Sequence, residues 1–479
     1  MKILFASSEV EPFSKTGGLA DVSHALPAAL ADRGHSLMVV SPQYTSVKAD
    51  GFERLGAIKL RFPFGEESAV LRGTRWSDRH LVTFLDHPGF YGRDGIYHGD
   101  SEYPDNHLRF AFLSIGALAA AQTLEFEPDI VHVNDWQTAL AALALAQGYR
   151  DTSLGRAKSV LTIHNLAYQG IFPKQAMDEL GLPWELFTPD GVEFYDRVNF
   201  LKAGIIFADA LTTVSKRYAQ EIQGPELGFG LDDVLRRRSA DLRGILNGVD
   251  YSEWDPEKDP IIPQHFSASD LSGKEKCKLT LLREFGLPGS ASRFPLFSMV
   301  SRLVGQKGLD LVLEALPWML EGDLCLTVLG TGDPKYEQGL LQLQKRWPAR
   351  VAVRIGFEPT LAHLVEAGSD FFLMPSRYEP CGLNQMYSLR YGTVPIVRAT
   401  GGLDDTVEDI SSENGTGIKF RPYSASALAA SVHRALELYA DPARLQRVRA
   451  NGMMADYSWA TSAAQYEALY QSLIGSERI

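Results

Sequence analysis

Two copies of the string Thr-Gly-Gly-Leu-x-Asp, at residues 16–21 and 400–405, are the feature of this chain best suited to chemistry. Each copy follows a short apolar run and opens a stretch with helical spacing, which predicts a strand, a Gly-Gly turn and a helix. Glycines let the backbone approach a ligand closely, and the N–H groups and dipole at a helix start favour an anion. Either copy alone could be an ordinary turn. The repeat, with Lys15 just before the first copy, favours an anionic nucleotide ligand held between two similar halves.

Further functional residues are expected at one edge of each sheet, because ligands of parallel α/β sheets bind beyond the carboxyl ends of the strands. The polar residues and glycines that follow the predicted strands are Lys15, Asp135, His164, Asn247, Arg302, Lys307, Gly330, Arg377, Glu379, Thr400, Gly401 and Gly402. They include both cations and carboxylates, and they come from both halves of the chain. This set is what an enzyme that acts in a cleft on a charged donor would need.

The elements that must position these residues alternate along the chain. Short segments such as Ile130–Val133 and Val160–Ile163 are rich in β-branched residues and bounded by polar turns, which is typical of parallel strands buried on both faces. Stretches with helical spacing lie between them. The pattern predicts an α/β protein of two doubly wound, Rossmann-like domains. A junction near Gly244 would separate a first domain at residues 1–243 from a second at 244–457.

Three absent motifs narrow the chemistry. The sequence has no Asp-x-Asp, the pair with which many sugar transferases hold a divalent ion on a diphosphate. It also lacks Gly-x-Gly-x-x-Gly after the first strand, and it lacks Gly-x-x-x-x-Gly-Lys-Ser/Thr. Without a metal ion, other groups must neutralise a departing diphosphate. Arg302 and Lys307, five residues apart, are suited to this, so we expect no metal site.

Length, composition and charge limit the class of protein. A chain of 479 residues exceeds one ordinary core, and its 45% hydrophobic and 22% charged residues are typical of a globular protein in water. The 47 basic and 59 acidic residues give a formal charge of −12, which argues against a nucleic-acid partner but not against a neutral polysaccharide. Three cysteines form a sparse set that favours reduced thiols over a disulfide framework.

The N-terminus shows no targeting signal. Met1–Ala6 is an apolar run too short for the core of a signal peptide, and Glu9 and Glu11 follow it closely. No stretch approaches eighteen uninterrupted apolar residues, so we expect no membrane span and no membrane partner. The cytoplasm is the simplest location.

Several strings are collinear with those of one known family. They are Lys15–Val22, Asn134–Gln137, Thr162–Gly170, Asn247–Asp250, Ser301–Gly308, Pro375–Leu383 and Thr400–Leu403. Together they cover nearly the whole chain, which resembles the bacterial glycogen synthases and plant starch synthases. The resemblance implies a GT-B type glycosyltransferase, with two Rossmann-like domains that face a central cleft. It also implies that a C-terminal helix at residues 458–479 completes the first domain.

The same resemblance implies an activity and its partners. Glucose would pass from ADP-glucose to the non-reducing end of glycogen or another α-1,4-glucan, with retention of configuration and release of ADP. ADP-glucose is a co-substrate, so no cofactor is implied.

The resemblance also implies a role for each matching residue. Lys15, Gly17 and Gly18 would hold the donor diphosphate, while Arg302 and Lys307 would neutralise charge on the departing ADP. His164 would lie against the glucosyl unit, Asp135 would bind sugar hydroxyls and Glu379 would orient the glucose. The five residues implied as catalytic are therefore His164, Glu379, Arg302, Lys307 and Asp135. The other implied pocket residues are Phe357, Cys381, Gly382, Leu383, Thr400, Gly401, Gly402, Asn247, Asp21 and Tyr91.

Two positions bear on the choice within the wider group. Many retaining nucleotide-sugar transferases carry Glu-x7-Glu, in which the second Glu grips the ribose, but the eighth residue after Glu379 is Tyr387. Glycogen synthases tend to lack this second carboxylate, so the change favours them. Phe357 would stack on adenine, although a tyrosine is often expected there. Two alternatives stay open: a retaining transferase of the same fold that uses a UDP-sugar, and a non-catalytic protein that binds a nucleotide-sugar or a glucan.

Overall fold

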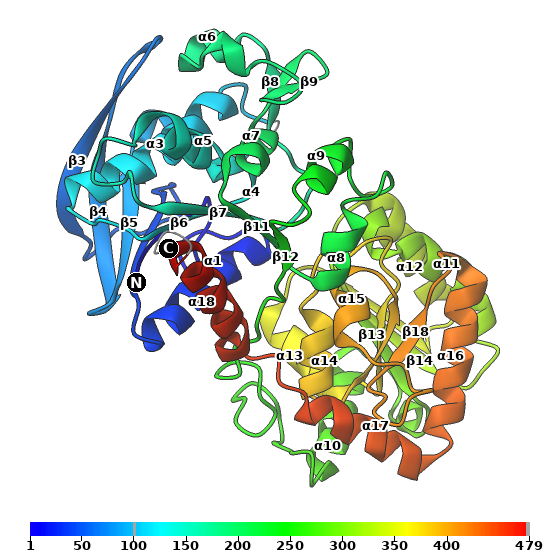
Figure 1. Ribbon diagram of the computed structural model, residues 1–479. Coiled ribbons are helices and arrows are strands. Elements are labelled where there is room, and N and C mark those ends of the chain that lie inside the picture. The colour runs from blue at the N-terminus through cyan, green and yellow to red at the C-terminus, as the bar shows by residue number, and fades with distance from the viewer. Residues whose placement is uncertain (99–101, 476–479) are drawn as a thin grey trace. The chain divides into compact units, whose positions relative to one another are not determined.

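The computed structural model describes residues 1–98 and 102–475. The chain divides into two compact units, which we call the first unit (Met1–Gly248 with Trp459–Ile479) and the second unit (Val249–Ser458) (Figure 1). The boundary at Gly248 lies shortly beyond the junction expected near Gly244, and the C-terminal segment belongs to the first unit. Residues 476–479 of the expected last helix lie outside the described residues.

The first unit is built on a nine-stranded sheet with the order β12-β11-β7-β6-β1-β2-β5-β4-β3. Its parallel strands are β12 (Leu242–Gly244), β11 (Ala210–Thr213), β7 (Lys158–Ile163), β6 (Ile130–Asn134), β1 (Lys2–Ala6), β2 (Ser36–Pro42) and β5 (His80–Asp86). Two antiparallel strands that the sequence pattern did not indicate, β4 (Gly65–Ser77) and β3 (Glu53–Phe62), extend one edge. The chain leaves β1 toward β2 on one side and reaches β6 on the other, so the order reverses beside β1.

Helices surround this sheet. They are α1 (Gly18–Asp32), α2 (Pro88–Tyr91), α3 (Asn106–Thr123), α4 (Asp135–Thr138), α5 (Leu140–Gly148), α6 (Ala176–Leu180), α7 (Phe200–Phe207), α8 (Lys216–Glu221), α9 (Asp232–Arg237) and α18 (Trp459–Gly475). Leu19, Val22 and Leu26 share one face of α1 and are buried, as their spacing predicts. α18 packs beside α1, and its Tyr470 hydroxyl lies 2.6 Å from Nδ1 of the buried His132 in β6.

A small three-stranded sheet also belongs to the first unit. It has the order β8-β10-β9 and consists of β8 (Ile171–Pro173), β9 (Glu193–Phe194) and β10 (Arg197–Asn199). Both pairings are antiparallel, and β9 and β10 form a hairpin. A short 3₁₀ turn, η1 (Trp184–Leu186), precedes the hairpin.

The second unit has a six-stranded parallel sheet with the order β15-β14-β13-β16-β17-β18. The strands are β13 (Leu296–Val300), β14 (Cys325–Gly330), β15 (Val351–Ile355), β16 (Phe371–Met374), β17 (Val394–Arg398) and β18 (Ile418–Phe420). In sequence order this is third, second, first, fourth, fifth and sixth, the arrangement of a doubly wound dinucleotide-type sheet. The expectation of two doubly wound α/β units is confirmed, and the order in this sheet reverses between β13 and β16.

Apolar layers cover both faces of the second sheet. The helices of this unit are α10 (Ser272–Glu284), α11 (Leu309–Met319), α12 (Pro334–Arg346), α13 (Pro359–Gly368), α14 (Asn384–Arg390), α15 (Gly401–Thr406), α16 (Ala425–Tyr439) and α17 (Pro442–Met454), with 3₁₀ turns η2 (Gly289–Arg293) and η3 (Gly305–Lys307). α11 and α16 bury residues such as Val312 and Val432 against one face, while α10 and α13 bury Leu281 and Val365 against the other. The sheet is thereby fixed, and only its strand ends can receive a ligand.

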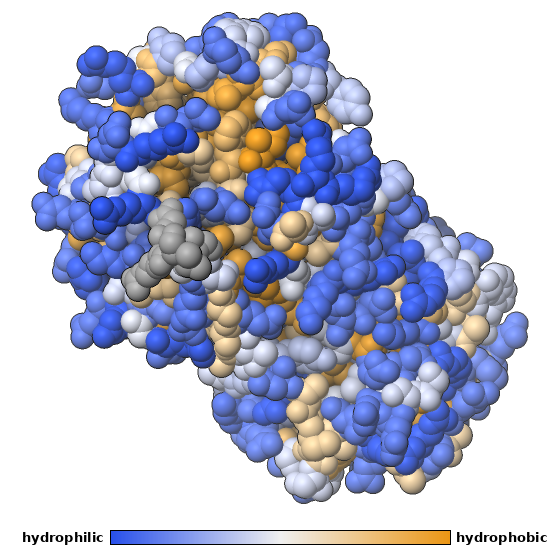
Figure 2. Space-filling view, viewed as in Figure 1, coloured by the Kyte–Doolittle hydropathy of each residue, from blue (hydrophilic) through white to orange (hydrophobic). Residues whose placement is uncertain are grey.

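The surface in the view of Figure 2 is mostly hydrophilic, with hydrophobic residues exposed in patches. Among residues 1–98 and 102–475, no helix is both long enough and apolar enough to cross a membrane.

Candidate functional site

The candidate residues fall into two groups, one in each unit. Those of the first unit follow β1, β6, β7 and β12, and those of the second follow β13, β15, β16 and β17. Both groups therefore lie beyond the carboxyl ends of parallel strands, as expected. Each group includes strands next to the point where its sheet order reverses, which is where open α/β sheets bind ligands.

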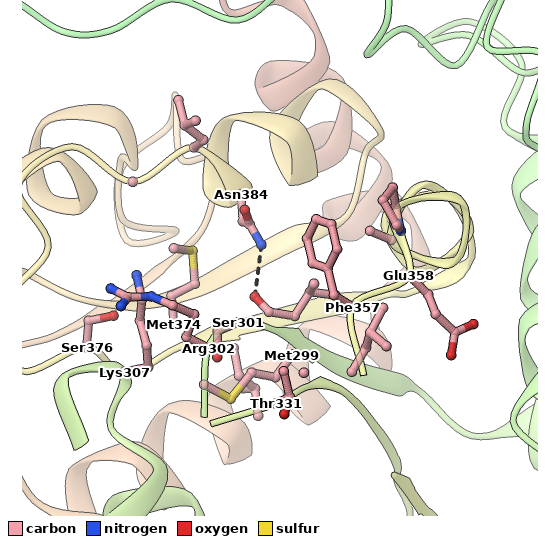
Figure 3. Close-up of a pocket in the computed structure, with 18 of the residues that line it drawn as sticks. Met299, Ser301, Arg302, Lys307, Thr331, Phe357, Glu358, Met374, Ser376 and Asn384 are labelled. Carbon is pink, nitrogen blue, oxygen red and sulfur yellow. Dashed lines mark hydrogen bonds between the residues drawn. The ribbon is translucent and has the colours of Figure 1, made fainter. Parts of the chain in front are cut away.

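The second unit contains a pocket of about 310 Å³ (Figure 3). Residues that line it include Met299, Ser301, Arg302, Lys307, Gly330, Thr331, Phe357, Glu358, Met374, Ser376, Glu379, Gly382, Leu383 and Asn384. Arg302, Lys307 and Ser376 lie at one end of the pocket, and Phe357 lies at the other. The pocket thus offers two cations and an aromatic ring at opposite ends, which matches the shape of a nucleoside diphosphate.

Lys307 and Glu379 form a tight pair in this pocket. Lys307 Nζ lies 2.6 Å from Glu379 Oε2, and the Ser376 hydroxyl donates to the same oxygen at 3.1 Å. Glu379 is only 6% exposed, so its charge depends on these two partners. The pair fixes the carboxylate and keeps a cation beside it, although the two residues were expected to contact different parts of the donor.

Phe357 is the most exposed large aromatic residue among those described, with 84% of its surface accessible. It follows β15 through Gly356, whose φ of +152° favours glycine. A ring held at a pocket rim with both faces in water gains by stacking on a planar base, which is the role that the resemblance implied.

Sequence reasoning missed Asn384, which holds two loops of the pocket together. Its Nδ2 donates to the Val300 carbonyl oxygen at 2.9 Å, linking the start of α14 to the end of β13 (Figure 3). Its position directly after the Glu379–Leu383 string is the signal that would have found it.

The second Gly-Gly string does not line this pocket but bonds the segment that carries Glu379. Thr400 and Cys381 are buried, and neither they nor Gly401 and Gly402 line the cavity. The Gly402 N–H group donates to the carbonyl oxygens of Glu379 and Pro380, each at 3.1 Å. The expectation that Gly402 offers this N–H group to a phosphate is therefore wrong for this structure, because the group already bonds the Glu379 segment.

Tyr387 occupies the position where other transferases carry a second carboxylate. Its ring stacks on Trp254, with centroids 3.9 Å apart and planes within 2°. Trp254 stacks in turn on His363, at 3.8 Å. This packing gives Tyr387 a structural role in the second unit.

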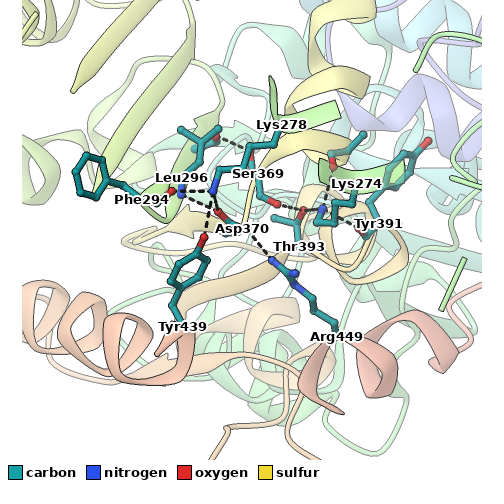
Figure 4. Close-up of polar contacts among 12 residues, drawn as sticks. Lys274, Lys278, Phe294, Leu296, Ser369, Asp370, Tyr391, Thr393, Tyr439 and Arg449 are labelled. Atoms are coloured by element: carbon teal, nitrogen blue, oxygen red, sulfur yellow. Dashed lines mark hydrogen bonds and ion pairs between the residues drawn. The ribbon is translucent and has the colours of Figure 1, made fainter. Parts of the chain in front are cut away.

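A buried charge cluster in the second unit involves none of the residues that line the pocket (Figure 4). Lys278 Nζ lies 2.6 Å from Asp370, which also pairs with Arg449 at 2.7 Å. Lys274 Nζ donates to the Tyr391 carbonyl oxygen at 2.9 Å and to the Thr393 hydroxyl at 2.7 Å. Burial lowers the pKa of Lys274 to about 7. These bonds join α10 to the sheet and to α17, so the cluster serves the fold.

In the first unit, Lys15 precedes the first Gly-Gly string and is half-exposed. Its Nζ lies 2.7 Å from Asp21 and 3.4 Å from Glu11. Partial burial disfavours the charged amine, but the two carboxylates outweigh it and raise the pKa of Lys15. Lys15 is therefore a cation, and Asp21 holds it at the start of α1. The resemblance had placed Asp21 in the pocket.

The first Gly-Gly loop is held by Glu9, which sequence reasoning missed. Glu9 is 2% exposed, and its carboxylate accepts from the Thr16 N–H group, the Thr16 hydroxyl at 2.7 Å and the Gly17 N–H group at 3.3 Å. The Tyr97 hydroxyl also donates to it. The Gly17 N–H group, expected to face a diphosphate, thus faces a protein carboxylate here. Within the described part of the first unit, the space above Gly17 and Gly18 nevertheless stays open, since a Cβ at either would meet no atom there within 4 Å.

Asp135 and Asn134 position the His164 loop. The His164 N–H group donates to Asp135 Oδ1 at 2.7 Å, and the Asn165 N–H group donates to the same oxygen at 3.4 Å. Burial raises the pKa of Asp135 to about 7 despite these two donors. Asp135 holds a φ of +53°, which is uncommon for a non-glycine residue and typical of functional sites.

The His164 ring is neutral and has a defined tautomer. Burial lowers its pKa to about 3. Asn134 Nδ2 donates to the Ala6 carbonyl oxygen at 2.9 Å, so Asn134 Oδ1 is the atom that lies 2.9 Å from His164 Nε2. A neutral ring must then carry its proton on Nε2 and accept at Nδ1. Asn134 is thus a positioning residue that the sequence pattern did not single out.

Tyr91 and Asn247, both expected in a pocket, lie in the first unit but differ in their hydrogen bonding. Tyr91 has no exposed surface, and its hydroxyl donates to the Arg109 carbonyl oxygen at 2.8 Å. The expectation that Tyr91 closes a pocket is wrong for this structure, because its ring packs in the core. Asn247 is 8% exposed, and within the described chain its Oδ1 is buried without a hydrogen-bond partner. Such an atom is normally satisfied, so Asn247 remains suited to a ligand.

No group of three or more His, Cys, Asp or Glu side chains within residues 1–98 and 102–475 is arranged to hold a metal ion. Metal independence stays a prediction.

Comparisons with known proteins agree with this arrangement. Residues 2–237 match the family model of the starch synthase catalytic domain, and residues 287–452 match that of the glycosyl transferases group 1. The chain is 57% identical to the glycogen synthase of Myxococcus xanthus, over 99% of this chain and 100% of that one. It is 47% identical to glycogen synthase 1 of Geobacter sulfurreducens, over 98% and 96% of the two chains.

Solved structures support the fold. The catalytic domain of starch synthase IV from Arabidopsis thaliana, bound to ADP and acarbose, matches with a TM-score of 0.90 and 33% identity over 99% of each chain. Sucrose-phosphate synthase from Thermosynechococcus elongatus matches with a TM-score of 0.62 and 18% identity, over 99% of this chain and 100% of that one, and so supports the fold alone. The GT-B type of fold is thereby confirmed, and the chain belongs to the family of glycogen synthases and starch synthases.

Proposed function

We propose that this protein is a glycogen synthase. It transfers glucose from ADP-glucose to the non-reducing end of an α-1,4-glucan, with retention of configuration, and releases ADP. The single observation that carries the proposal is the pocket of the second unit, with Arg302 and Lys307 at one end and Phe357 at the other. The relatives named glycogen synthase and the starch synthase structure with ADP and acarbose support it.

The pocket supplies what an ADP leaving group needs. Negative charge grows on the β-phosphate as its bond to the sugar breaks, and two cations beside it stabilise that charge more in the transition state than in the ground state. Arg302 and Lys307 provide these cations without a metal ion. Adenine stacks on Phe357, at the far end of the pocket.

The glucosyl transfer takes place in one step on one face of the sugar. The bond between glucose C1 and the β-phosphate oxygen breaks, and its electron pair leaves with ADP. The 4-hydroxyl oxygen of the acceptor bonds to C1 on the same face, and its proton passes to the departing phosphate oxygen. Glu379, held by Lys307 and Ser376, orients the glucose through its hydroxyls. Neutral His164, with Nε2 held by Asn134, accepts a hydrogen bond at Nδ1 from a sugar hydroxyl.

The proposal is tested by incubating the full-length protein with glycogen and either ADP-glucose or UDP-glucose, and measuring nucleotide release and glucose incorporation. We expect glycogen-dependent release of ADP and a higher kcat/KM with ADP-glucose. Equal or better efficiency with UDP-glucose would support the alternative transferase. Glycogen binding without transfer from either donor would support the non-catalytic alternative.

A further inference from the structure

Exposed aromatic residues gather in one region of the first unit. Tyr168, Tyr195 and Phe229 are 59%, 79% and 38% exposed, and we call these three the aromatic platform. Single exposed apolar residues are ordinary, but several on adjoining segments mark a binding surface.

Gln169 joins two segments of the platform. It is 6% exposed, and its Nε2 donates to the Leu166 carbonyl oxygen at 3.2 Å and to the Phe229 carbonyl oxygen at 3.1 Å. Its Oε1 accepts from Asn199 Nδ2 at 2.6 Å, at the end of β10. The segments that carry Tyr168 and Phe229 are thus fixed to the β9–β10 hairpin by one buried amide.

The tip of that hairpin presents the third ring. Tyr195 and Asp196 form the turn with φ of +51° and +60°, and Tyr195 contacts Phe194 edge-on at 4.7 Å. Lys174 Nζ pairs with Asp196 at 2.8 Å and braces the turn. A Cβ on Gly230 would lie 2.9 Å from the Phe194 ring and 3.7 Å from the Tyr195 ring, so the Phe229–Gly230 loop lies against the hairpin. A tyrosine in a conformation that favours Asn or Gly, with its ring in water, indicates a functional reason.

The platform is continuous with the loop that carries His164. Tyr168 lies four residues after His164, and its N–H group donates to the Asn165 carbonyl oxygen at 3.2 Å within the same turn. The Leu166 N–H group donates to the Tyr218 hydroxyl at 3.1 Å, which fixes the loop from below. A ligand on the platform therefore lies next to the loop proposed to contact the reacting sugar.

We propose that the aromatic platform binds the α-1,4-glucan chain behind the end that reacts. The inference rests on the proposed function and names a site for its polymeric acceptor. A sugar ring packs its C–H face on an aromatic ring and leaves its hydroxyls to polar partners, such as the two tyrosine hydroxyls. At the hairpin tip, the charges of Lys174 and Asp196 cancel each other. The formal charge of −12 on the whole chain disfavours an anionic polymer. A neutral polymer of sugar rings fits both features.

The test compares Tyr195→Asn with the native protein and with Trp184→Ala. Asparagine suits the positive φ of the turn, so Tyr195→Asn removes the ring without added strain. Trp184 is 48% exposed in the same unit and donates to Asp178 at 2.8 Å, which makes it a matched control outside the platform. The readouts are glycogen affinity in native gels containing glycogen, KM for glycogen and KM for ADP-glucose.

We expect Tyr195→Asn to weaken glycogen affinity and raise the KM for glycogen by about tenfold, the usual size of one lost aromatic contact. KM for ADP-glucose should stay unchanged, and Trp184→Ala should resemble the native protein. Native glycogen affinity in Tyr195→Asn, or an equal loss in Trp184→Ala, would overturn the proposal. So would dissociation of an oligomer in sedimentation velocity without a change in glycogen affinity, since the platform would then be a subunit interface. If glycogen affinity falls in Tyr195→Asn while the native protein transfers no glucose, the platform stands and the proposed function fails.

Discussion

The two Thr-Gly-Gly-Leu-x-Asp strings have the same sequence pattern but use their glycines differently. In the first copy, a Cβ at Gly17 or Gly18 would meet no described atom of the first unit within 4 Å. In the second copy, a Cβ at Gly401 would collide with the Glu379 carbonyl oxygen, and one at Gly402 with that of Cys381. The first loop keeps room for a ligand, whereas the second brings a helix start against the segment that carries Glu379. A repeated motif therefore preserves a backbone shape, and its surroundings decide whether a ligand or the chain itself fills the space.

Alanine substitution of one glycine in each loop should distinguish the two loops most clearly. Gly402→Ala should destabilise the protein by about 3 kcal/mol or more, because the Cβ forces the Cys381 segment to move. Gly17→Ala should cost less than about 1 kcal/mol, since its φ of −158° suits any residue, yet it should raise the KM for ADP-glucose. Thermal denaturation and steady-state kinetics of both variants measure this. Equal stability losses would remove the distinction between the two loops.

Substitution of Lys307, near the second loop, should also reduce activity more than substitution of Lys15, near the first loop. Lys307→Ala should lower kcat by about 10²-fold, because it removes a partly buried cation that is proposed to stabilise the leaving group. Lys15→Ala should reduce activity by about tenfold or less, because Lys15 is half-exposed and solvent screens its charge. The melting temperature of each variant serves as the control for folding. A change in KM alone for Lys307→Ala would assign this residue to ground-state binding.

Through Asp135, both the activity and the folding stability of the protein should depend on pH. Its pKa is raised to about 7, so the carboxylate that holds the His164 N–H group becomes protonated as the pH falls through 7. Activity should therefore rise with pH around 7, and Asp135→Asn should flatten that limb of the kcat profile. The raised pKa also means that the charged form destabilises the folded state as pH increases from about 4 to 7, so Asp135→Asn should gain stability relative to the native protein at pH 8 but not at pH 4. An unchanged pH profile in Asp135→Asn would assign the limb to another group.

The smallest expected effect is that of metal removal. We propose that Arg302 and Lys307 take the place of a divalent ion, so activity in excess EDTA should remain near its full value. Release of ADP with and without EDTA measures this. A loss that magnesium or manganese restores would show that the cations of the second unit do not suffice.

The α/β alternation, the division into two units and several residues that line the pocket of the second unit could be predicted from the sequence. These follow from local information: apolar runs of strand length, helical spacing, and polar residues directly after strands. Arg302, Lys307, Glu379 and Phe357 were predicted in this way or through the family resemblance, and all four line one pocket.

Which groups these residues contact depends on the tertiary structure. Glu9, which holds the first loop, accepts a hydrogen bond from Tyr97, 88 positions away along the chain. Asn134, at the end of β6, sets the tautomer of His164, which follows the neighbouring strand β7. It also placed Tyr91 in the core and turned the Gly402 N–H group toward the chain. Hydrogen bonds and packing between distant segments depend on how sheets and loops meet in space. Spacing along the chain carries no information on that, because it reports only the local period and conformation of the backbone.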